Sequence, residues 1–165
     1  MIESERLLLI PIDTKMIDSL IESDVSFLHT YGYINDGGAY LKPSPDYLIK
    51  IKQRLLEHPE EYPLAVDHLI VVKNIKTVIG TIYYKNLPDS EGVSEVGYGM
   101  KAIYEGNGYM SEALNAMLDY GKKSGIKIVV ADTTFQNDKS QNVLKRCGFS
   151  VISVQEDRLW FRIIL

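Results

Sequence analysis

The chain contains 165 residues, of which 45% are hydrophobic and 24% are charged, and its formal net charge is −4 at pH 7. This length suits one globular domain over residues 1–165, and the acidic balance argues against general nucleic-acid binding, which needs a basic surface. No apolar run approaches the roughly 20 residues of a membrane-spanning helix, so we expect no membrane partner.

Cysteine and histidine usage bears on location and on metal chemistry. Cys147 is the only cysteine, so no internal disulfide can form, and no basic-then-apolar leader opens the chain. Both features favour a cytoplasmic location. The three histidines lack the spacing of a metal-ligand set, and we predict no metal site.

Apolar periods in the first half of the chain predict both strands and helices. The predicted elements are a strand over 6–12, a helix over 16–21, a helix beginning at 45, and strands over 69–72 and 78–84. Thr14 is predicted to cap the first helix. Ser44 is predicted to cap the second, with Pro45 in its first position.

The second half predicts a strand–helix–strand unit with parallel strands, followed by one more helix and two strands. The elements are a strand over 95–100, a helix over 110–123, a strand over 126–131, a helix over 137–147, and strands over 149–154 and 159–165. Asn137 is the predicted N-cap of the last helix. The predicted fold class is therefore α/β (α+β), a mixed central sheet of about seven strands with about four helices.

The loop over 105–110 joins the first strand of that unit to its helix. Gly106 and Gly108 permit a sharp turn and a close approach of a ligand to the main chain. The loop leads into a helix N-terminus, whose free N–H groups form a site for a phosphate or pyrophosphate. The alternative is a tight turn that uses glycine. Gly97, Gly99 and Ala102 match a dinucleotide fingerprint in letters only, because no helix begins directly after them.

Several motifs in this half occur together in one known family. The loop Ile103-Tyr104-Glu105-Gly106-Asn107-Gly108 approximates the pattern [QR]-x-x-G-x-[GA], with Ile103 in place of Gln or Arg. Three further motifs occur in family order: Glu95-Val96-Gly97-Tyr98, then Gly108-Tyr109-Met110-Ser111-Glu112-Ala113-Leu114, then Asn137 with Ser140 and Gly148-Phe149. Over essentially its whole length the chain resembles the GCN5-related N-acetyltransferase (GNAT) family. It is most similar to the branch that includes ribosomal-protein N-terminal acetyltransferases.

The resemblance implies a GNAT-like acetyltransferase domain that uses acetyl-CoA as co-substrate. The residues predicted to bind acetyl-CoA or CoA are Met100, Ala102, Glu105, Gly106, Asn107, Gly108, Tyr109, Met110, Asn137, Ser140 and Lys145. The pyrophosphate is expected on the N–H groups of 105–110, and the pantetheine amides on Asn137. Lys145 or Lys139 is expected to reach the 3′-phosphate, although both lysines also fit a solvated helix face.

The predicted catalytic residues are Glu95, Met100 and Asn137. The Met100 N–H is expected to bind the oxyanion, because backbone donors are already oriented before the reaction. Glu95 is expected to act as the general base, and its alternative role is a cross-strand surface carboxylate.

Many members of the family protonate the leaving thiolate with a Tyr at the position of Leu144 here. Tyr104 or Tyr109 are possible replacements. Alternatively, the thiolate leaves without an acid, since a thiol has a pKa of about 8.5.

The resemblance also places the first two helices and their connection on the acceptor side. Tyr31, Tyr33 and Tyr40 therefore either shape a substrate pocket or pack the connection against the body. The predicted acceptor is a primary amine, on a small molecule or at a protein N-terminus, and the chain is either a monomer or a homodimer. Two alternatives stay open: a CoA-binding sensor or interaction module without catalysis, and a plain nucleotide-phosphate binder.

Overall fold

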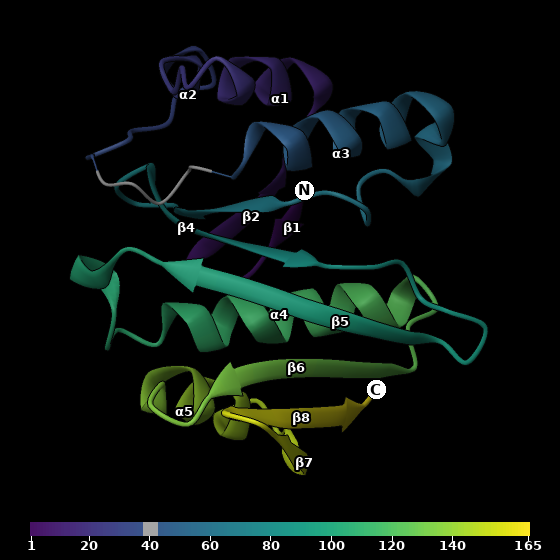
Figure 1. Ribbon diagram of the computed structural model, residues 1–165. Helices are drawn as coiled ribbons and strands as arrows, with labels where there is room; N and C mark the ends of the chain where they lie inside the picture. The colour runs from purple at the N-terminus through teal and green to yellow at the C-terminus, as the bar shows by residue number, and fades with distance from the viewer. Residues whose placement is uncertain (38–42) are drawn as a thin grey trace.

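The structure is a computed structural model that describes residues 1–37 and 43–165. Its centre is an eight-stranded sheet in the order β1-β2-β3-β4-β5-β6-β8-β7, with helices on both faces (Figure 1). The strands are β1 (Ile2–Glu3), β2 (Leu7–Pro11), β3 (His68–Val72), β4 (Thr77–Tyr84), β5 (Val93–Met100), β6 (Ile128–Thr134), β7 (Ser150–Gln155) and β8 (Arg158–Ile164). The helices are α1 (Thr14–Ile21), α2 (Phe27–Thr30), α3 (Pro45–Glu57), α4 (Tyr109–Lys123) and α5 (Asp138–Arg146), with 3-10 turns η1 (Pro59–Glu61) and η2 (Ala102–Tyr104).

The predicted mixed α/β class is confirmed, and so is the parallel pair, formed by β5 and β6. All other neighbouring strands in the described part of the chain are antiparallel. The sequence did not predict β1 or α2. They have two and four residues, which is too short for a period of 2 or 3.6 residues to be recognised.

The predicted helix starts are confirmed for α3 and α5 and wrong for α1. The Ser44 side chain accepts the Tyr47 N–H, and the Asn137 side chain accepts the Ser140 N–H. In α1 the cap is Asp13, whose Oδ1 accepts the Met16 N–H at 2.8 Å. Thr14 is the first helical residue. Asp and Thr both serve as N-caps, and the one that keeps extended backbone dihedrals takes the role.

Two hydrophobic clusters hold the helices to opposite faces of the sheet. One packs α4 and α5 against the strands and contains Leu9, Ile82, Leu114, Leu144 and Phe161, all 0% exposed. The other packs α1 and α3 against the opposite face and contains Ile17, Leu48, Leu69, Val71 and Val78, also 0% exposed. Burial of each Leu or Ile side chain contributes about 1.5–3 kcal/mol. The sheet is therefore a middle layer, and the edges of its strands are the places where a ligand can reach its backbone.

The parallel strands β5 and β6 separate partway along their length. They pair only at Val93↔Ile128, Ser94↔Val129 and Glu95↔Val130. Beyond Glu95, β5 continues to pair with β4 on its other side as far as Met100. The remainder of β5 thus has a neighbouring strand on one side only in the described part of the chain.

Tyr31 and Tyr33, two of the predicted pocket residues, pack on the α1 side of the molecule. Tyr31 donates its hydroxyl to Asp13 at 3.1 Å and meets Phe27 edge-on. Tyr33 packs against the cluster under α1 and α3. These contacts correspond to the packing alternative for both residues, whereas Tyr40 lies outside the described residues.

Candidate active site

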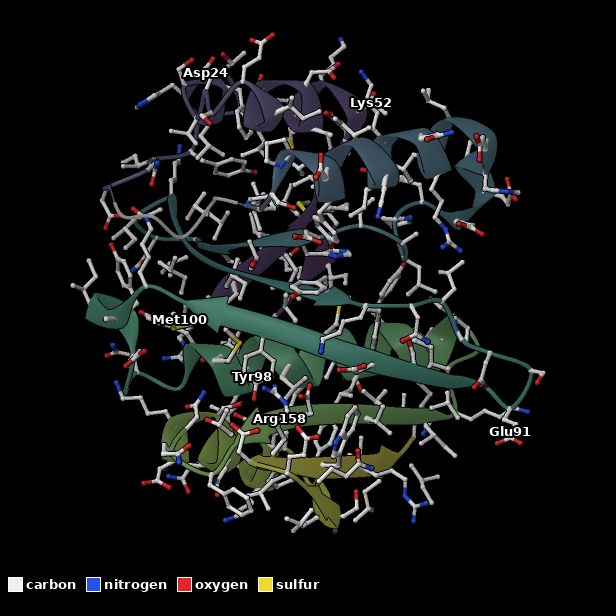
Figure 2. All side chains as sticks on the ribbon, viewed as in Figure 1. Asp24, Lys52, Glu91, Tyr98, Met100 and Arg158 are labelled. Carbon is white, nitrogen blue, oxygen red and sulfur yellow. The ribbon has the colours of Figure 1, made fainter. Side chains whose placement is uncertain are left out.

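The free edge of β5 exposes the backbone groups of Tyr98 and Met100. Lys85 N donates to Glu95 O at 2.7 Å and Lys101 N donates to Ile79 O at 2.8 Å, so odd-numbered residues of β5 direct their backbone groups toward β4. Because direction alternates along a strand, the N–H and C=O groups of Tyr98 and Met100 point toward β6, where pairing has ended. Both side chains lie near the end of β5 in Figure 2. This edge can pair with an extended ligand.

The glycine loop follows η2 and leads into α4. Gly106 and Gly108 have φ values of +79° and +77°, which residues with a Cβ rarely adopt. No described residue accepts a hydrogen bond from the N–H groups of 106–111. These donors and the positive end of the α4 dipole have the chemistry that an anion-binding surface requires.

The free edge of β5, the glycine loop, α4 and α5 enclose a cavity of about 380 Å³, here called the loop cavity. Most of the predicted site residues line it: Met100, Glu105, Gly106, Gly108, Tyr109, Met110, Asn137 and Ser140. The structure therefore brings together residues of β5, the glycine loop and α4 with residues of α5 that come much later in the chain.

Four predicted site residues do not line the loop cavity: Glu95, which is described below, and three of the residues predicted to bind CoA. Ala102 is exposed within η2. The Asn107 side chain instead donates to the backbone carbonyl groups of Tyr104 and Glu105, both at 3.1 Å, and so stabilises the conformation of the loop. Lys145 is also absent from the lining, where the two cationic side chains are Lys139 and Arg146. Lys139 pairs with Glu105 across the cavity mouth. The helical period explains why Lys139 and Arg146 line the cavity and Lys145 does not, because residues 139, 142, 143 and 146 share one face of α5.

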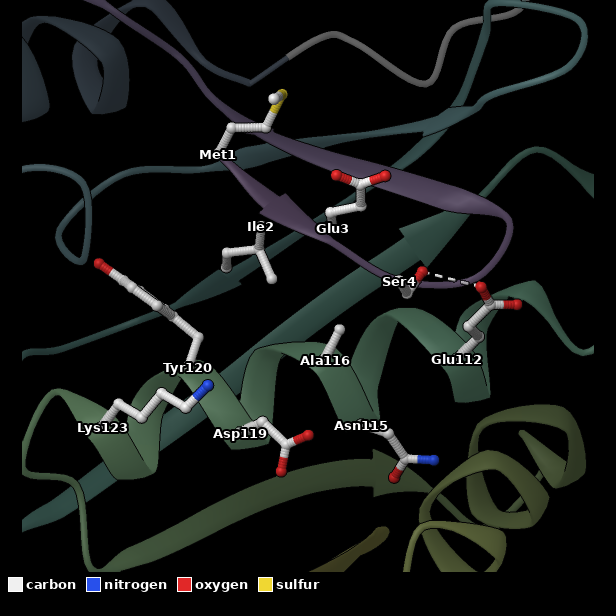
Figure 3. Close-up of a pocket in the computed structure, with 10 residues that line it drawn as sticks. All are labelled: Met1, Ile2, Glu3, Ser4, Glu112, Asn115, Ala116, Asp119, Tyr120 and Lys123. Carbon is white, nitrogen blue, oxygen red and sulfur yellow. Dashed lines mark hydrogen bonds between the residues drawn. The ribbon is translucent and has the colours of Figure 1, made fainter.

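Glu112, in the first turn of α4, fastens the N-terminal segment beside the glycine loop. Its carboxylate accepts from Ser4 Oγ at 2.8 Å, Arg6 N at 2.7 Å and Arg6 Nε at 2.7 Å. Figure 3 shows Ser4 pointing at Glu112 beside a cavity of about 510 Å³ between β1 and α4. Arg6 Nη1 donates to Asn107 O at 3.1 Å, and the guanidinium lies 4.6 Å from the Tyr109 ring centroid. Arg6 therefore connects Glu112 to the glycine loop.

Replacement of Glu112 by Gln is expected to lower the free energy of unfolding by about 1–2 kcal/mol at pH 7, because a neutral amide accepts three hydrogen bonds less strongly. Burial raises the pKa of Glu112, but the hydrogen bonds from Arg6 and Ser4 outweigh it and hold the pKa below its ordinary value. A depressed carboxyl pKa contributes stability above the unfolded pKa and loses it as pH falls through the folded pKa. The difference between wild type and variant should therefore shrink below about pH 4.

Urea denaturation at pH 7 and pH 3 measures this effect. Asp119→Asn is the matched control, since Asp119 is an exposed acid on the same helix without an ion pair in the described structure. A difference that stays constant between the two pH values would contradict the role of the Glu112 charge.

Tyr98 also lines the loop cavity, although the sequence analysis gave its side chain no role. Its hydroxyl is 3.0 Å from Ser140 Oγ, and burial raises the pKa of Tyr98 to about 12. Leu144 is 0% exposed and belongs to the core. Tyr104 donates its hydroxyl to Asp36, and the Tyr109 ring packs under Arg6. The strand period could have identified Tyr98, because it shares the β5 face with Val96 and Met100.

Glu95 lies at the point where β5 leaves β6, within a row of four charged side chains. Lys85 on the loop after β4 pairs with Glu95 and also with Asp132 of β6, the latter at 3.1 Å. Asp132 in turn pairs with Arg158. Burial acts to raise the pKa of Asp132, yet the hydrogen bonds from Arg158 and Lys85 hold it below its ordinary value. The row therefore carries two cations and two carboxylates.

A second cavity of about 190 Å³, here called the network cavity, lies beside this charged row. Its lining includes Tyr83, Lys85, Asp132 and Arg158. It shares Tyr98 and Ser140 with the loop cavity. A Cβ on Gly97 would meet the Tyr83 ring at 2.8–2.9 Å. The Tyr83 ring thus covers the side-chain-free face of Gly97.

Neither a metal-binding cluster nor a membrane-spanning helix occurs in the described part of the chain. Among residues 1–37 and 43–165, no group of three or more His, Cys, Asp or Glu side chains is arranged to hold a metal ion. Within the same residues, no helix has the length and apolarity that a bilayer crossing requires.

The parted parallel strands, the glycine loop at a helix N-terminus and the cavity between them suit an extended, anionic ligand. The family model described as "Acetyltransferase (GNAT) domain" matches residues 6–150. Two curated proteins are similar to the chain. "Uncharacterized N-acetyltransferase YjdG" of Bacillus subtilis (strain 168) is 26% identical over 90% of this chain and 89% of its own length. "Uncharacterized N-acetyltransferase p20" of Bacillus licheniformis is 31% identical over 48% of this chain, and the match spans only 46% of that protein.

The solved structure of a ribosomal L7/L12 alpha-N-protein acetyltransferase, RimL, in complex with coenzyme A has the same fold. Its TM-score is 0.68 at 21% identity, and the match covers 98% of this chain and 96% of that chain. The chain belongs to the GNAT family of acetyltransferases. The resemblance found in the sequence is confirmed, as is the class of enzyme, and the fold is shared with the ribosomal-protein branch.

Proposed function

We propose that the protein transfers an acetyl group from acetyl-CoA to a primary amine by direct attack within a ternary complex. The observation that carries this proposal is the free edge of β5 at Tyr98 and Met100, which faces the loop cavity and adjoins the network cavity. Two cavities that share Tyr98 and Ser140 suit a donor and an acceptor that meet between them. Acetyl-CoA would supply an activated thioester at that point.

The residues of the loop cavity fit the chemistry of CoA. The free N–H groups of 106–111 suit the pyrophosphate, and Lys139 and Arg146 suit a further phosphate. The backbone edge of β5 suits the amides of the pantetheine arm, which can pair as an added strand would. Asn137 uses its Oδ1 to cap α5, so its amide Nδ2 is the atom we propose for the pantetheine. RimL was solved with coenzyme A, which supports this choice of ligand.

The Met100 N–H is the proposed oxyanion donor, because it points from the end of β5 into the gap. The hydroxyl pair of Tyr98 and Ser140 lies on the wall common to both cavities. A protonated phenol there can deliver a proton to the leaving thiolate, the role left vacant at Leu144.

An amine attacks only when it is neutral. An α-amine with a pKa near 8 loses its proton more readily than a lysine side chain with a pKa of about 10.4. A protein N-terminus or a small amine of similar basicity is therefore the proposed acceptor, in line with the alpha-N-protein acceptor in the name of RimL. We keep a cytoplasmic location as part of the proposal, since a lone buried Cys147 suits a reducing compartment.

Calorimetric titration with acetyl-CoA, desulfo-CoA and ATP tests the donor site first. We expect micromolar binding of both CoA compounds and none of ATP. A panel of primary amines and peptides with free N-termini then tests turnover. Tight CoA binding without turnover of any acceptor would favour the CoA-binding module instead, an alternative that the buried Leu144 and the 74% exposed Ile103 keep open. Failure to bind CoA would overturn the proposal.

Replacement of Glu95 by Gln is expected to reduce kcat/KM for an α-amine about 100-fold at pH 7, the scale of a lost general base. The loss should diminish as pH approaches the pKa of the amine, because the neutral amine then forms without help. The pH profile of kcat/KM measures it. Glu91→Gln is the matched control, since Glu91 is an exposed acid in the turn before β5 (Figure 2). Equal activity of wild type and E95Q at pH 7 would leave Glu95 only as the partner of Lys85.

A further inference from the structure

Asp36 joins the segment that follows α2 to the turn that follows β5. Its Oδ1 accepts from Lys101 Nζ and its Oδ2 accepts from the Tyr104 hydroxyl. Asn35 adds a third contact, because its Oδ1 accepts from the same Lys101 Nζ at 3.0 Å. Two adjacent residues therefore bind the segment 101–104 through three hydrogen bonds.

The contacts of Asp36 fall at both ends of η2. Lys101 precedes η2 and follows Met100 directly, and its N–H donates to Ile79 O at 2.8 Å. Tyr104 ends η2 and lines the loop cavity. The Tyr104 N–H also donates to Lys101 O at 3.0 Å. Asp36 thus holds the short turn that connects the proposed oxyanion donor to the glycine loop.

The segment that carries Asp36 is itself anchored to the sheet through Ile34. Ile34 N donates to Lys76 O at 2.8 Å, and Val78 N donates to Ile34 O at 2.9 Å, which fixes the start of this segment on β4. The segment 34–37 belongs to the connection between α2 and α3. Its position therefore depends on β4 and on the turn after β5 together.

The ion pair between Asp36 and Lys101 is largely removed from solvent. The Lys101 side chain is only 6% exposed and that of Asp36 is 26% exposed. A buried ammonium group needs a carboxylate partner, because desolvation otherwise makes the charge costly. The hydrogen bond from Lys101, with that from Tyr104, holds the pKa of Asp36 below its ordinary value.

We propose that Asp36 is a positioning residue that couples the segment 34–37 to the turn 101–104 beside the proposed donor site. The inference rests on the proposed function, since it assigns CoA to the glycine loop. Because Tyr104 lines the loop cavity and donates to Asp36, CoA bound in that cavity would order Tyr104 and η2, and Asp36 would transmit that order to 34–37.

Desulfo-CoA titration and amide hydrogen exchange, measured on the intact chain, test this coupling. In wild type, desulfo-CoA should slow exchange over 105–110 and also over 34–37. In Asp36→Asn, affinity for desulfo-CoA should fall about tenfold, a factor typical of coupled sites, and exchange over 34–37 should no longer respond. Asp18→Asn removes the ion pair between Asp18 of α1 and Lys52 of α3; it is the matched control and should behave as wild type.

The double variant Asp36→Asn with Lys101→Met separates positioning from folding. It removes the ammonium group that D36N leaves without a carboxylate partner, so its stability should recover relative to D36N. Exchange over 34–37 should still fail to respond to desulfo-CoA, because the ion pair is gone and the amide at position 36 keeps at most a neutral hydrogen bond with Tyr104. If wild type binds desulfo-CoA normally and exchange over 34–37 in D36N or in the double variant responds as it does in wild type, the coupling role of Asp36 is overturned and the proposed donor site is not. Lack of desulfo-CoA binding to wild type would overturn the proposed donor site as well.

Discussion

Replacement of Gly80 by Ala is expected to lower the free energy of unfolding by about 2–4 kcal/mol, the range of a severe steric conflict in a core, and to remove most acetyl transfer. A Cβ on Gly80 would lie 2.4 Å from Gly99 O and 3.2 Å from Met100 Cα. Both neighbours are backbone atoms of the opposite strand, so no side-chain rotation relieves the contact. Because Gly80 pairs with Met100, β4 and β5 must separate where the proposed oxyanion donor lies.

Gly97→Ala is the matched control for this variant. Gly97 is also a glycine in the middle of the sheet, and its Cβ would be 2.8–2.9 Å from the Tyr83 ring. That ring is a side chain that can rotate, so G97A should lose less stability than G80A. Urea denaturation and kcat/KM for acetyl transfer measure both effects. Equal losses for the two variants would contradict the distinction between backbone and side-chain contacts.

Replacement of Gly106 by Ala is expected to weaken desulfo-CoA binding at least tenfold. The φ of +79° costs a residue with a Cβ about 1–2 kcal/mol. The loop would relax toward negative φ and turn its N–H groups away from the proposed pyrophosphate. Calorimetric titration measures the affinity, and urea denaturation measures the accompanying loss of stability.

Gly125→Ala supplies the matched control for the loop. Gly125 has a φ of +91° after the C-terminus of α4, and a Cβ added there, like one added at Gly106, would meet no atom within 4 Å. The two variants should lose similar stability, since both place an Ala in the left-handed region with open space around it. Only G106A should lose affinity. Wild-type affinity in G106A would show that the glycine loop is a turn and not a phosphate site.

Local sequence signals predicted most of the fold. The spacing of Met110, Leu114 and Leu118 predicts α4, and all three are buried against the sheet as a helical face requires. Ser44 and Asn137 cap the helices that they were expected to cap. The failures were also local: Thr14 and Asp13 both suit an N-cap, and β1 is too short to show a period.

Part of the candidate site followed in the same way. Gly106 and Gly108 were predicted from the loop pattern, and both take the positive φ that only glycine adopts easily. Lys145 or Lys139 was predicted to reach the 3′-phosphate, and charge alone does not determine which face of α5 a lysine occupies. The cavity is lined by Lys139 and Arg146 and not by Lys145. Tyr98 received no role because its partner, Ser140, lies 42 positions later in the chain.

The sequence by itself determined the order of the longer strands and helices, the glycine loop and the family motifs, because each is encoded by residues that lie close together in the chain. Only the tertiary structure decided where β5 parts from β6 and which charges meet. Lys85 faces two carboxylates, Glu95 and Asp132, and Asp36 meets Lys101 across 65 positions. The physical reason is that any acid can pair with any base in the unfolded chain. Strand neighbours and folded loops select the pairs that form.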